Sequence, residues 1–224
     1  MAEIDDDPTY GEEIIPWAVD LIGPVAGRFL DLGCGEGQLL RAVAAQVSVG
    51  CDVTATLLEQ AASDGVTVQC RLPDLGWIRD GSIEAAACVL VLEHLTEASS
   101  FFDEVRRVLE PGGALTLITN HPAYTAGGAG PVIDLSDGEV LWRWGAYFTQ
   151  GTSHEPAGGR SVAFHHRPMG ELLNSAARNG LYLEVFQERG LSPRSVARDP
   201  GLAGQEHFPR LLGVRWRAHG DSVG

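Results

Sequence analysis

Between residues 29 and 37 the chain reads Phe29-Leu30-Asp31-Leu32-Gly33-Cys34-Gly35-Glu36-Gly37. An apolar segment here runs directly into three glycines, and a helical pattern follows them. Glycines at such a turn permit positive φ and let a ligand approach the backbone without interference from a Cβ. The N-terminus of the following helix favours negative charge, such as a carboxylate. Binding of a nucleotide-type ligand explains this turn, and so does turn geometry alone.

Two acidic residues frame the glycines. Asp31 lies on the expected strand, where its charge repels a pyrophosphate and attracts an ammonium group. Asp52 comes 21 residues later at the end of the next apolar segment, the spacing at which an acid accepts hydrogen bonds from ribose hydroxyls. Gln38 breaks the G-x-G-x-x-G pattern of dinucleotide sites. A ligand with an adenosine and a zwitterionic amino-acid tail explains both acids.

The first two thirds of the chain alternate apolar runs with amphipathic stretches, which predicts a parallel sheet covered on both faces. Strands are expected at 28–32, 47–51, 66–70, 85–92 and 114–119, and helices at 38–46, 54–63 and 99–109. The last third differs. A helix at 169–178 and two strands at 181–187 and 211–218 are expected to follow a loop-rich insertion, in which 125–131 and 153–159 read as loops.

The length of 224 residues suits a single domain. We divide it into an N-terminal helical segment (1–27), a cofactor-binding core (28–120), an acceptor-site insertion or lid (121–168) and a C-terminal part with a helix and the last two strands (169–224).

Charge and composition exclude several functions. The net charge of −14 disfavours nucleic-acid binding, because phosphate contacts need a basic surface. All sixteen basic residues are Arg, so Schiff-base and P-loop chemistry, which use lysine, are absent. The four cysteines are not paired at metal-binding spacing, so we expect small buried residues and no metal. With no apolar run long enough to span a membrane and an acidic start, we expect a cytoplasmic protein.

The chain resembles the class I S-adenosylmethionine-dependent methyltransferases in four motifs. These are the glycine turn at 29–37, the strand end Val49-Gly-Cys-Asp52, the segment from Asp80 to Leu95 with its Glu93-His94 pair, and the turn Leu109-Glu-Pro-Gly-Gly113. The resemblance covers about residues 10 to 120. It implies a Rossmann-like α/β fold with a doubly wound seven-stranded sheet, mostly parallel with an antiparallel last strand. It also implies S-adenosylmethionine as cofactor and S-adenosylhomocysteine as product.

The resemblance places the cofactor site residue by residue. Tyr10 is expected to cover the cofactor's tail, and the backbone of Val89 and Leu90 to lie beside the transferred methyl. The adenine is expected to meet either Asp74 or the backbone around Leu72, and we favour the second. His94 either packs and caps a helix or has a chemical role. The remaining cofactor residues are those of the turn and the two acids: Asp31, Gly33, Cys34, Gly35, Gly37 and Asp52.

Histidines bracket the insertion. Methyl transfer needs a base only if the acceptor arrives protonated, and histidine suits the deprotonation of a hydroxyl. His121 follows the fifth expected strand and is stiffened by Pro122. His165 and His166 precede Arg167, and this segment resembles one that walls the acceptor pocket of small-molecule methyltransferases. We expect His121 or His166 to be the base and prefer His121, because its strand ends beside the fourth strand.

Aromatic residues gather inside the insertion. Trp142 and Trp144 alternate, which fits a buried strand face. The other interpretation is an aromatic wall or lid over the acceptor, with Tyr124, Tyr147, His165 and Arg167 also contacting it and the glycines of 125–130 as hinge.

The sequence therefore predicts an enzyme that methylates a small molecule, on a hydroxyl of a sugar, phenol or quinol, with a histidine as general base. A nitrogen or carbon acceptor stays open, and a homodimer is compatible with the sequence. Two alternatives also stay open. One is a non-catalytic protein of this fold that binds a partner through its aromatic insertion, and the other is an NAD-dependent oxidoreductase.

Overall fold

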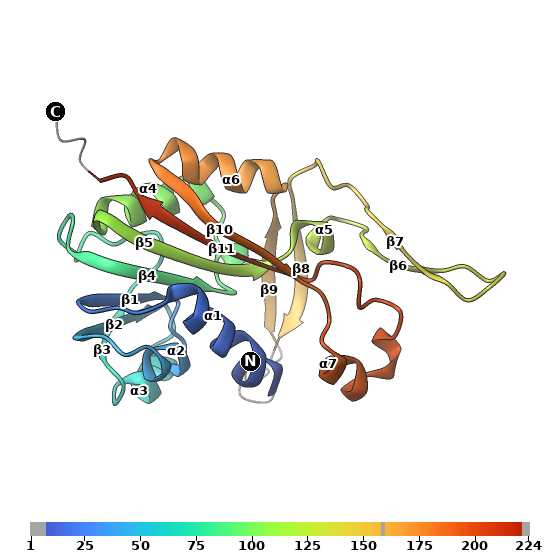
Figure 1. Cartoon of the computed structure of the whole chain (residues 1–224), viewed down its shortest axis with the longest axis horizontal. Coiled ribbons are helices and arrows are strands. Elements are labelled where there is room, and N and C mark those ends of the chain that lie inside the picture. The colour runs from blue at the N-terminus through green and yellow to red at the C-terminus, as the bar shows by residue number, and fades with distance from the viewer. Residues whose placement is uncertain (1–7, 158–159, 221–224) are drawn as a thin grey trace.

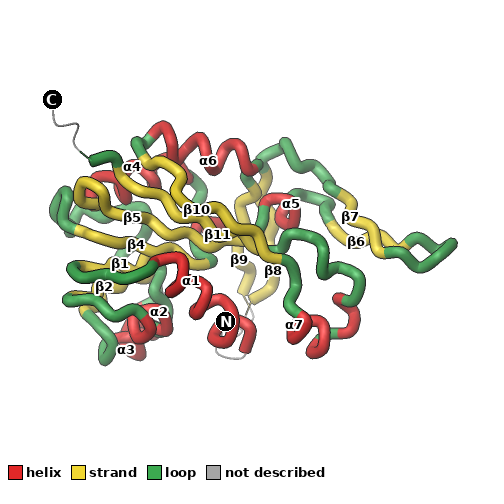
Figure 2. The backbone as a smooth tube through the Cα atoms, viewed as in Figure 1, coloured by secondary structure: helices red, strands yellow, loops and turns green. Residues whose placement is uncertain are grey.

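The computed structural model describes residues 8–157 and 160–220. Its centre is a twisted seven-stranded sheet in the order β10-β11-β5-β4-β1-β2-β3 (Figures 1 and 2). Neighbouring strands are parallel except at β11, which is antiparallel to both β5 and β10. The strands are β1 (Arg28–Leu32), β2 (Val47–Asp52), β3 (Val66–Gln69), β4 (Ile83–Val89), β5 (Leu109–Asn120), β10 (Leu181–Arg189) and β11 (Leu211–Ala218).

Helices cover both faces of this sheet, so the predicted doubly wound α/β fold is confirmed. One apolar core joins the sheet to α4 (Ala98–Val108) and α6 (Met169–Arg178), with Phe101 and Phe102 fully buried. The other joins it to α1 (Ile15–Ile22), α2 (Gln38–Ala42) and α3 (Ala55–Ala61). β4 is apolar along most of its length because it is buried on both sides.

Short elements connect and extend these layers. A π-helical turn, η2 (Tyr10–Ile14), leads into α1, and a 3₁₀ turn, η3 (Leu92–His94), follows β4. α5 (Pro122–Thr125) follows β5, and α7 (Pro193–Arg198) with η4 (Pro200–Leu202) lies between β10 and β11. No helix among the described residues is long and apolar enough to cross a membrane.

Two hairpins form the segment between α5 and α6. β6 (Gly130–Ile133) pairs with β7 (Val140–Arg143), and this hairpin projects away from the body in Figure 1. β8 (Gly151–Ala157) pairs with β9 (Arg160–His166), which lies across the end of the main sheet. The expectation of a loop at 153–159 was wrong for residues 153–157, which form most of β8, because an antiparallel partner supplies their hydrogen bonds. Residues 158 and 159 lie outside the described part.

Some predicted boundaries also differ. α2 ends at Ala42 rather than residue 46, because Val43 is already extended. β5 begins at Leu109 rather than 114: Leu109 pairs with Ile83, and a bulge follows before regular pairing resumes. Of the four cysteines, all free, Cys70 is half-buried and the other three are buried as expected.

Candidate cofactor and acceptor site

The glycine turn is held against the end of β2. The amides of Gly33 and Cys34 both donate to Cys51 O, at 2.8 and 2.9 Å. Gly33 and Gly35 have φ of 84° and 51°, a region that side chains disfavour, so the turn needs glycine for its conformation. This turn lies at the carboxyl ends of parallel strands, where open α/β sheets bind ligands.

The two glycines differ in what a side chain would meet. A Cβ on Gly33 would collide with the side chain of Val91. A Cβ on Gly35 would have no described atom within 4 Å. Gly33 is therefore required for packing inside the protein, whereas the space beside Gly35 is open to a ligand.

Asp52 ties the turn to β2. Its Oδ2 accepts a hydrogen bond from Gly35 N at 3.1 Å and its Oδ1 accepts one from Thr54 N at 2.8 Å. Each carboxylate oxygen has two lone pairs, so both oxygens can also accept from hydroxyls. The position and orientation of Asp52 thus fit a ribose at this edge.

The carboxylate of Asp31 is buried and incompletely hydrogen-bonded. Its side chain is only 3% exposed, and its Oδ2 has no hydrogen-bond partner among the described residues. Burial, with a smaller contribution from the charge of Asp52, raises the pKa of Asp31 to about 7. An unpartnered buried carboxylate is costly unless a donor satisfies it, and the ammonium group of S-adenosylmethionine is such a donor. The residues present therefore fit this cofactor.

Tyr10 lies near enough to Asp31 to be influenced by its charge. Burial raises the pKa of the Tyr10 hydroxyl, and the charge of Asp31 raises it further. Tyr10 reaches Asp31 from η2, a part of the chain far from β1 in sequence. It is thus positioned to cover the end of the site where the ammonium would lie.

The end of β4 has an unusual backbone. Leu90 is the one non-glycine residue of the described part with positive φ, at 54°. Its amide donates to Ile118 O at 2.7 Å, which holds the chain as it leaves the sheet. Strain of this kind, of order 1 kcal/mol or more, is kept where the surroundings over-determine it, often at functional sites. Val89 and Leu90 lie at the same sheet edge as the glycine turn.

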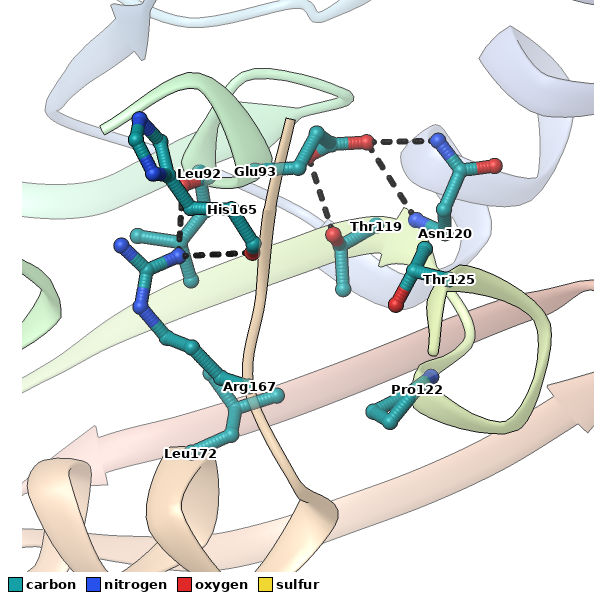
Figure 3. Close-up of a pocket in the computed structure, with 9 residues that line it drawn as sticks. All are labelled: Leu92, Glu93, Thr119, Asn120, Pro122, Thr125, His165, Arg167 and Leu172. Carbon is teal, nitrogen blue, oxygen red and sulfur yellow. Dashed lines mark hydrogen bonds between the residues drawn. The ribbon is translucent and has the colours of Figure 1, made fainter. Parts of the chain in front are cut away.

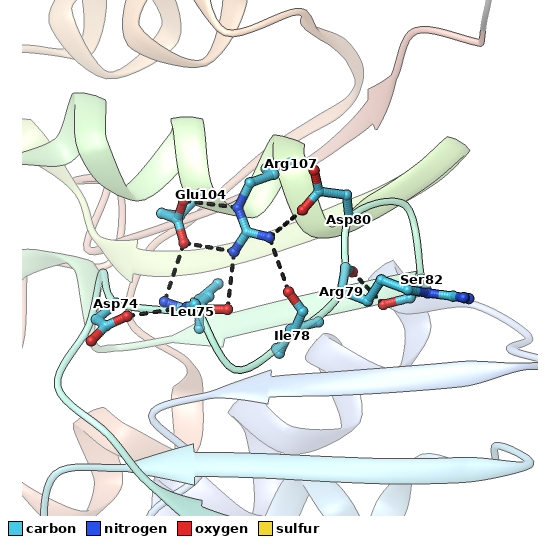
Figure 4. A network of polar contacts seen from close by, with 9 residues as sticks. Asp74, Leu75, Ile78, Arg79, Asp80, Ser82, Glu104 and Arg107 are labelled. Atoms are coloured by element: carbon cyan, nitrogen blue, oxygen red, sulfur yellow. Dashed lines mark hydrogen bonds and ion pairs between the residues drawn. The ribbon is translucent and has the colours of Figure 1, made fainter.

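The connection from β3 to β4 is anchored to α4 by one arginine (Figure 4). Arg107 donates to Glu104, to Asp80 and to the carbonyls of Leu75 and Ile78. Its hydrogen bonds with Glu104 and then Asp80 raise the pKa of the guanidinium. This network holds the segment that contains the two candidate adenine residues.

Those two residues differ in exposure. Asp74 is exposed, and its Oδ1 accepts a hydrogen bond from Gly76 N at 3.1 Å. Leu72 is half-buried and packs against the core. Both remain candidates for the adenine, and their placement favours an apolar contact from Leu72.

His94 points toward the β8–β9 hairpin. Its Nδ1 is 2.9 Å from Ala163 O, and its ring meets Phe164 edge-on at 4.6 Å between centroids. A carbonyl only accepts, so Nδ1 carries the hydrogen. The contacts of His94 thus join η3 to β9, and they support the packing interpretation of this residue.

A small pocket lies beyond the ends of β4 and β5, between these strands and β9 (Figure 3). Its volume is about 30 Å³, room for about two water molecules. The pocket is lined by Leu92, Glu93, Thr119, Asn120, Pro122, Thr125, His165, Arg167 and Leu172.

Glu93 is the charged centre of one wall. It is buried, and its carboxylate accepts hydrogen bonds from Thr119 Oγ1 at 2.9 Å and from Asn120 N and Nδ2 at 3.3 and 2.8 Å. Three donors hold it in one orientation. Glu93 belongs to one of the four sequence motifs, but no role was predicted for its side chain or for Thr119 and Asn120. The signal for Glu93 was a carboxylate directly after the apolar run 85–92.

Arg167 forms the opposite wall. Its guanidinium donates to the carbonyls of Leu92, Leu95 and His165. Burial lowers the pKa of Arg167, and the charges of nearby glutamates offset this in part. Arg167, the residue after β9, therefore binds to both ends of η3 and fixes the turn that carries Glu93.

The three candidate histidines differ sharply in their contacts. His121 is buried and caps α5: its Nδ1 accepts from Ala123 N at 3.0 Å, and its Nε2 is 2.8 Å from Glu188 Oε1. Burial lowers the pKa of His121, which Glu188 opposes. Since Nδ1 accepts, neutral His121 donates from Nε2 to Glu188. Both nitrogens are engaged, and His121 does not line the pocket.

His166 is buried beside the pocket. Its Nε2 lies 2.8 Å from Tyr147 O and its Nδ1 2.9 Å from the hydroxyl of Thr125. His165, its neighbour, lines the pocket and pairs through Nδ1 with Thr152 Oγ1 at 3.0 Å. Burial, followed by the charge of Arg167, lowers the pKa of His165. The histidine that touches a pocket hydroxyl is therefore His166.

The aromatic residues form two groups. Trp142 stacks on Tyr124 at 5.8 Å and donates from Nε1 to Ala123 O, while Arg210 lies 3.8 Å over the Tyr124 ring. These contacts anchor the β6–β7 hairpin to α5, and neither ring lines the pocket. Tyr147 contacts His166 and lies between Trp144 and Phe148, which are 59% and 89% exposed. A buried strand face is thus excluded for Trp144.

No group of three or more His, Cys, Asp or Glu side chains among the described residues is arranged to hold a metal ion.

Comparisons with known proteins agree with this geometry. A family model described as "Methyltransferase domain" matches residues 30–117. A crystal structure of an S-adenosylmethionine-dependent methyltransferase from Mesorhizobium loti has a TM-score of 0.78 and 28% identity, covering 90% of this chain and 96% of that one. A ubiquinone biosynthesis O-methyltransferase of Xanthomonas axonopodis pv. citri is 34% identical over 43% of this chain and 44% of that protein.

An uncharacterized 37.1 kDa protein in transposon TN4556 of Streptomyces fradiae is 37% identical over 39% of this chain and 28% of that protein. The chain thus matches less than half the length of these curated relatives. The family model covers the three glycines of the turn, both acids and the whole of β4, and the solved structure extends the likeness to 90% of the chain. The chain belongs to the class I S-adenosylmethionine-dependent methyltransferase superfamily.

Proposed function

We propose that this protein transfers a methyl group from S-adenosylmethionine to a hydroxyl group of a small molecule. The observation that carries the cofactor half is Asp31, whose buried Oδ2 finds no donor in the described part of the chain; the cofactor's ammonium would supply one. Asp52 and the open space at Gly35 complete a site that fits the ribose and tail. The sulfonium itself supplies the reactive methyl.

The pocket between β4, β5 and β9 is the proposed acceptor site. Two of its lining residues, Leu92 and Glu93, follow closely in sequence after the strained Leu90, beside which the methyl is expected. Its walls combine a hydrogen-bonded carboxylate, Glu93, with the apolar Leu92, Pro122 and Leu172. Six of the nine lining residues have polar side chains, so the pocket can orient a small polar molecule by hydrogen bonds. The relative named as an O-methyltransferase supports a hydroxyl acceptor.

His166 is the proposed base. An acceptor hydroxyl must lose its proton as the oxygen attacks, and a general base aids this step. Both ring nitrogens are engaged in each histidine, but one partner of His166 is the pocket-lining hydroxyl of Thr125. The partners of His121, Ala123 N and Glu188, do not line the pocket. We therefore assign to His121 a structural role and to His166 the chemical one.

Two experiments test this function. Calorimetry with S-adenosylhomocysteine should show binding that weakens in Asp52→Ala. Incubation with methyl-labelled S-adenosylmethionine and a small-molecule extract should give a labelled product whose methyl chemical shift in NMR identifies an O-methyl group. Absence of binding contradicts the cofactor, and binding without any labelled product contradicts the enzyme and favours a non-catalytic role.

A further inference from the structure

His166 is held in one tautomer. Its Nε2 is 2.8 Å from Tyr147 O, and a backbone carbonyl only accepts hydrogen bonds. Nε2 therefore carries the hydrogen, and the neutral ring has its lone pair on Nδ1. The second neighbour, Thr125 Oγ1, is 2.9 Å from Nδ1. Thr125 must then donate its hydroxyl hydrogen to Nδ1, which leaves the lone pairs of its oxygen free for another donor.

Thr125 faces the acceptor pocket, and His166 lies behind it. Pro122 and Thr125, three residues apart on the single turn of α5, both line the pocket. Figure 3 shows Thr125 on the side of the pocket opposite His165 and Arg167. His166 is only 4% exposed and is not among the lining residues. Its access to an acceptor therefore runs through Thr125.

The contacts of His166 match those of histidines that activate a hydroxyl group. A hydroxyl that donates to a histidine, whose second nitrogen donates to a fixed acceptor, is the arrangement by which proteins activate an oxygen. Here the fixed acceptor is the Tyr147 carbonyl, and the Tyr147 hydroxyl in turn accepts from Met169 N at 3.2 Å. Tyr147 is thereby tied to the start of α6, which keeps its carbonyl in place.

The geometry points to a proton relay in which Thr125 takes the proton of the acceptor hydroxyl and passes its own to His166. This inference rests on the proposed O-methylation. The acceptor oxygen bonds to the methyl carbon as the carbon–sulfur bond breaks, and that bond's electron pair stays on sulfur. The acceptor proton moves to Thr125 Oγ1 while the Thr125 proton moves to His166 Nδ1. Thr125 is regenerated, and His166 becomes a cation that solvent later deprotonates.

A matched pair of residues supplies the control. Thr152 and His165 form a second threonine–histidine contact of 3.0 Å on the β8–β9 hairpin, but Thr152 does not line the pocket. Thr125→Val removes the hydroxyl with little change of shape, and Thr125→Ser keeps it. Thr152→Val makes the same change as Thr125→Val at the control pair.

The relay is tested with the labelled product formed from the small-molecule extract. Thr125→Val should lower the rate of its formation roughly 10²-fold or more, as expected when general-base catalysis is lost. Thr125→Ser should recover most of the rate that Thr125→Val loses, and Thr152→Val should stay close to the wild-type rate. Binding of S-adenosylhomocysteine should be unchanged in all three variants, which separates a lost relay from a lost fold.

A second readout does not depend on turnover. Nitrogen-15 NMR of the protein without acceptor should show His166 protonated at Nε2 and unprotonated at Nδ1, with the Nδ1 shift changing in Thr125→Val and not in Thr152→Val. A ring protonated at Nδ1, or a Thr125→Val variant as fast as wild type, overturns the relay. If wild type binds S-adenosylhomocysteine but forms no labelled product, the proposed function itself fails.

Discussion

At the scale of single residues, Asp31 is the group whose energetics the site depends on most. Its carboxylate is buried and one oxygen lacks a partner, so the folded protein holds its proton more tightly than the unfolded chain does. The folded pKa is about 7 and the unfolded value 3.8. Between these values the folded state binds more protons, and the free energy of unfolding therefore falls as pH rises.

Asp31→Asn should remove this fall in the free energy of unfolding with rising pH. We expect the variant without ligand to be more stable than wild type at pH 8, with the difference vanishing near pH 4. Ionising Asp31 with a folded pKa of about 7 instead of 3.8 costs the folded state about 4 kcal/mol, which is the gain in stability expected for Asp31→Asn at pH 8. Thermal or urea unfolding across this range measures it, with the exposed Asp74→Asn as control.

The same substitution should impair cofactor binding, since a neutral amide does not pair with an ammonium group. Asp31→Asn is thus expected to gain stability and lose affinity for S-adenosylhomocysteine together. Unchanged stability between pH 4 and 8 would show that Asp31 is satisfied in the free protein by something other than the cofactor.

Substitutions at Gly33 and Gly35 test packing and cofactor binding separately. Gly33→Ala should unfold more easily, because its Cβ collides with Val91. Gly35→Ala, where no described atom is near, should carry only the backbone cost of about 1 to 2 kcal/mol for a side chain at positive φ. Its larger effect should be on S-adenosylhomocysteine affinity, which calorimetry measures beside the denaturation midpoint. Wild-type affinity in folded Gly35→Ala would mean that the cofactor does not approach this glycine.

At the scale of elements, the N-cap of α5 is the structural role that we propose for His121. His121 is its N-cap, and losing a cap side chain costs about 1 kcal/mol. His121→Ala should therefore lower stability while leaving the rate of methyl transfer nearly unchanged. His121→Asn should recover much of the stability, because asparagine is also a favourable N-cap.

Rate and unfolding measurements on the His121 variants distinguish the two roles. A stable His121→Asn protein whose rate has fallen by the roughly 10²- to 10⁴-fold of a lost base would return that role to His121.

The pH dependence of stability gives an independent check on His121. Burial lowers the pKa of His121, so its neutral form stabilises the fold, and this contribution should be lost as pH falls below about 6.5.

The order of the elements was predictable from the sequence, and their long-range partners were not. The apolar runs of β1, β4 and β11 and the helix at 169–178 appear as local periodicities. The β8–β9 hairpin does not, since polar residues such as Ser153 and His154 become a strand only because β9 pairs with them. The candidate site residues also include some that the sequence predicts and some that it does not. Asp31, Asp52 and the glycines follow from spacing, whereas the Thr125–His166 contact joins residues 41 apart and needs the folded hairpin.

At the scale of the whole molecule, polar contacts join η2, near the start of the chain, to the segment around α7, near its end. Glu12, two residues after Tyr10, pairs with Arg198 of α7 at 2.8 Å and with Arg194 at 3.4 Å. Glu13 accepts from Ser192 Oγ at 2.7 Å. These contacts join η2 to α7, which also lie side by side in Figure 1.

Arg198→Ala should loosen this contact and weaken S-adenosylhomocysteine binding slightly. Exposed ion pairs contribute up to about 1 kcal/mol, which corresponds to roughly fivefold in affinity. Added salt should weaken wild-type binding and leave the variant less affected, because salt screens exposed charges. Arg194→Ala, at the longer contact, should change less. Equal affinity and equal salt dependence in wild type and Arg198→Ala would show that η2 closes over the site without help from α7.

The most direct test of the cofactor site is a calorimetric titration of the protein with S-adenosylhomocysteine, repeated after saturation with NAD. We predict that one molecule binds per chain, that NAD does not reduce its affinity, and that Asp52→Ala weakens it. The contradictory result would be no heat from S-adenosylhomocysteine together with measurable binding of NAD.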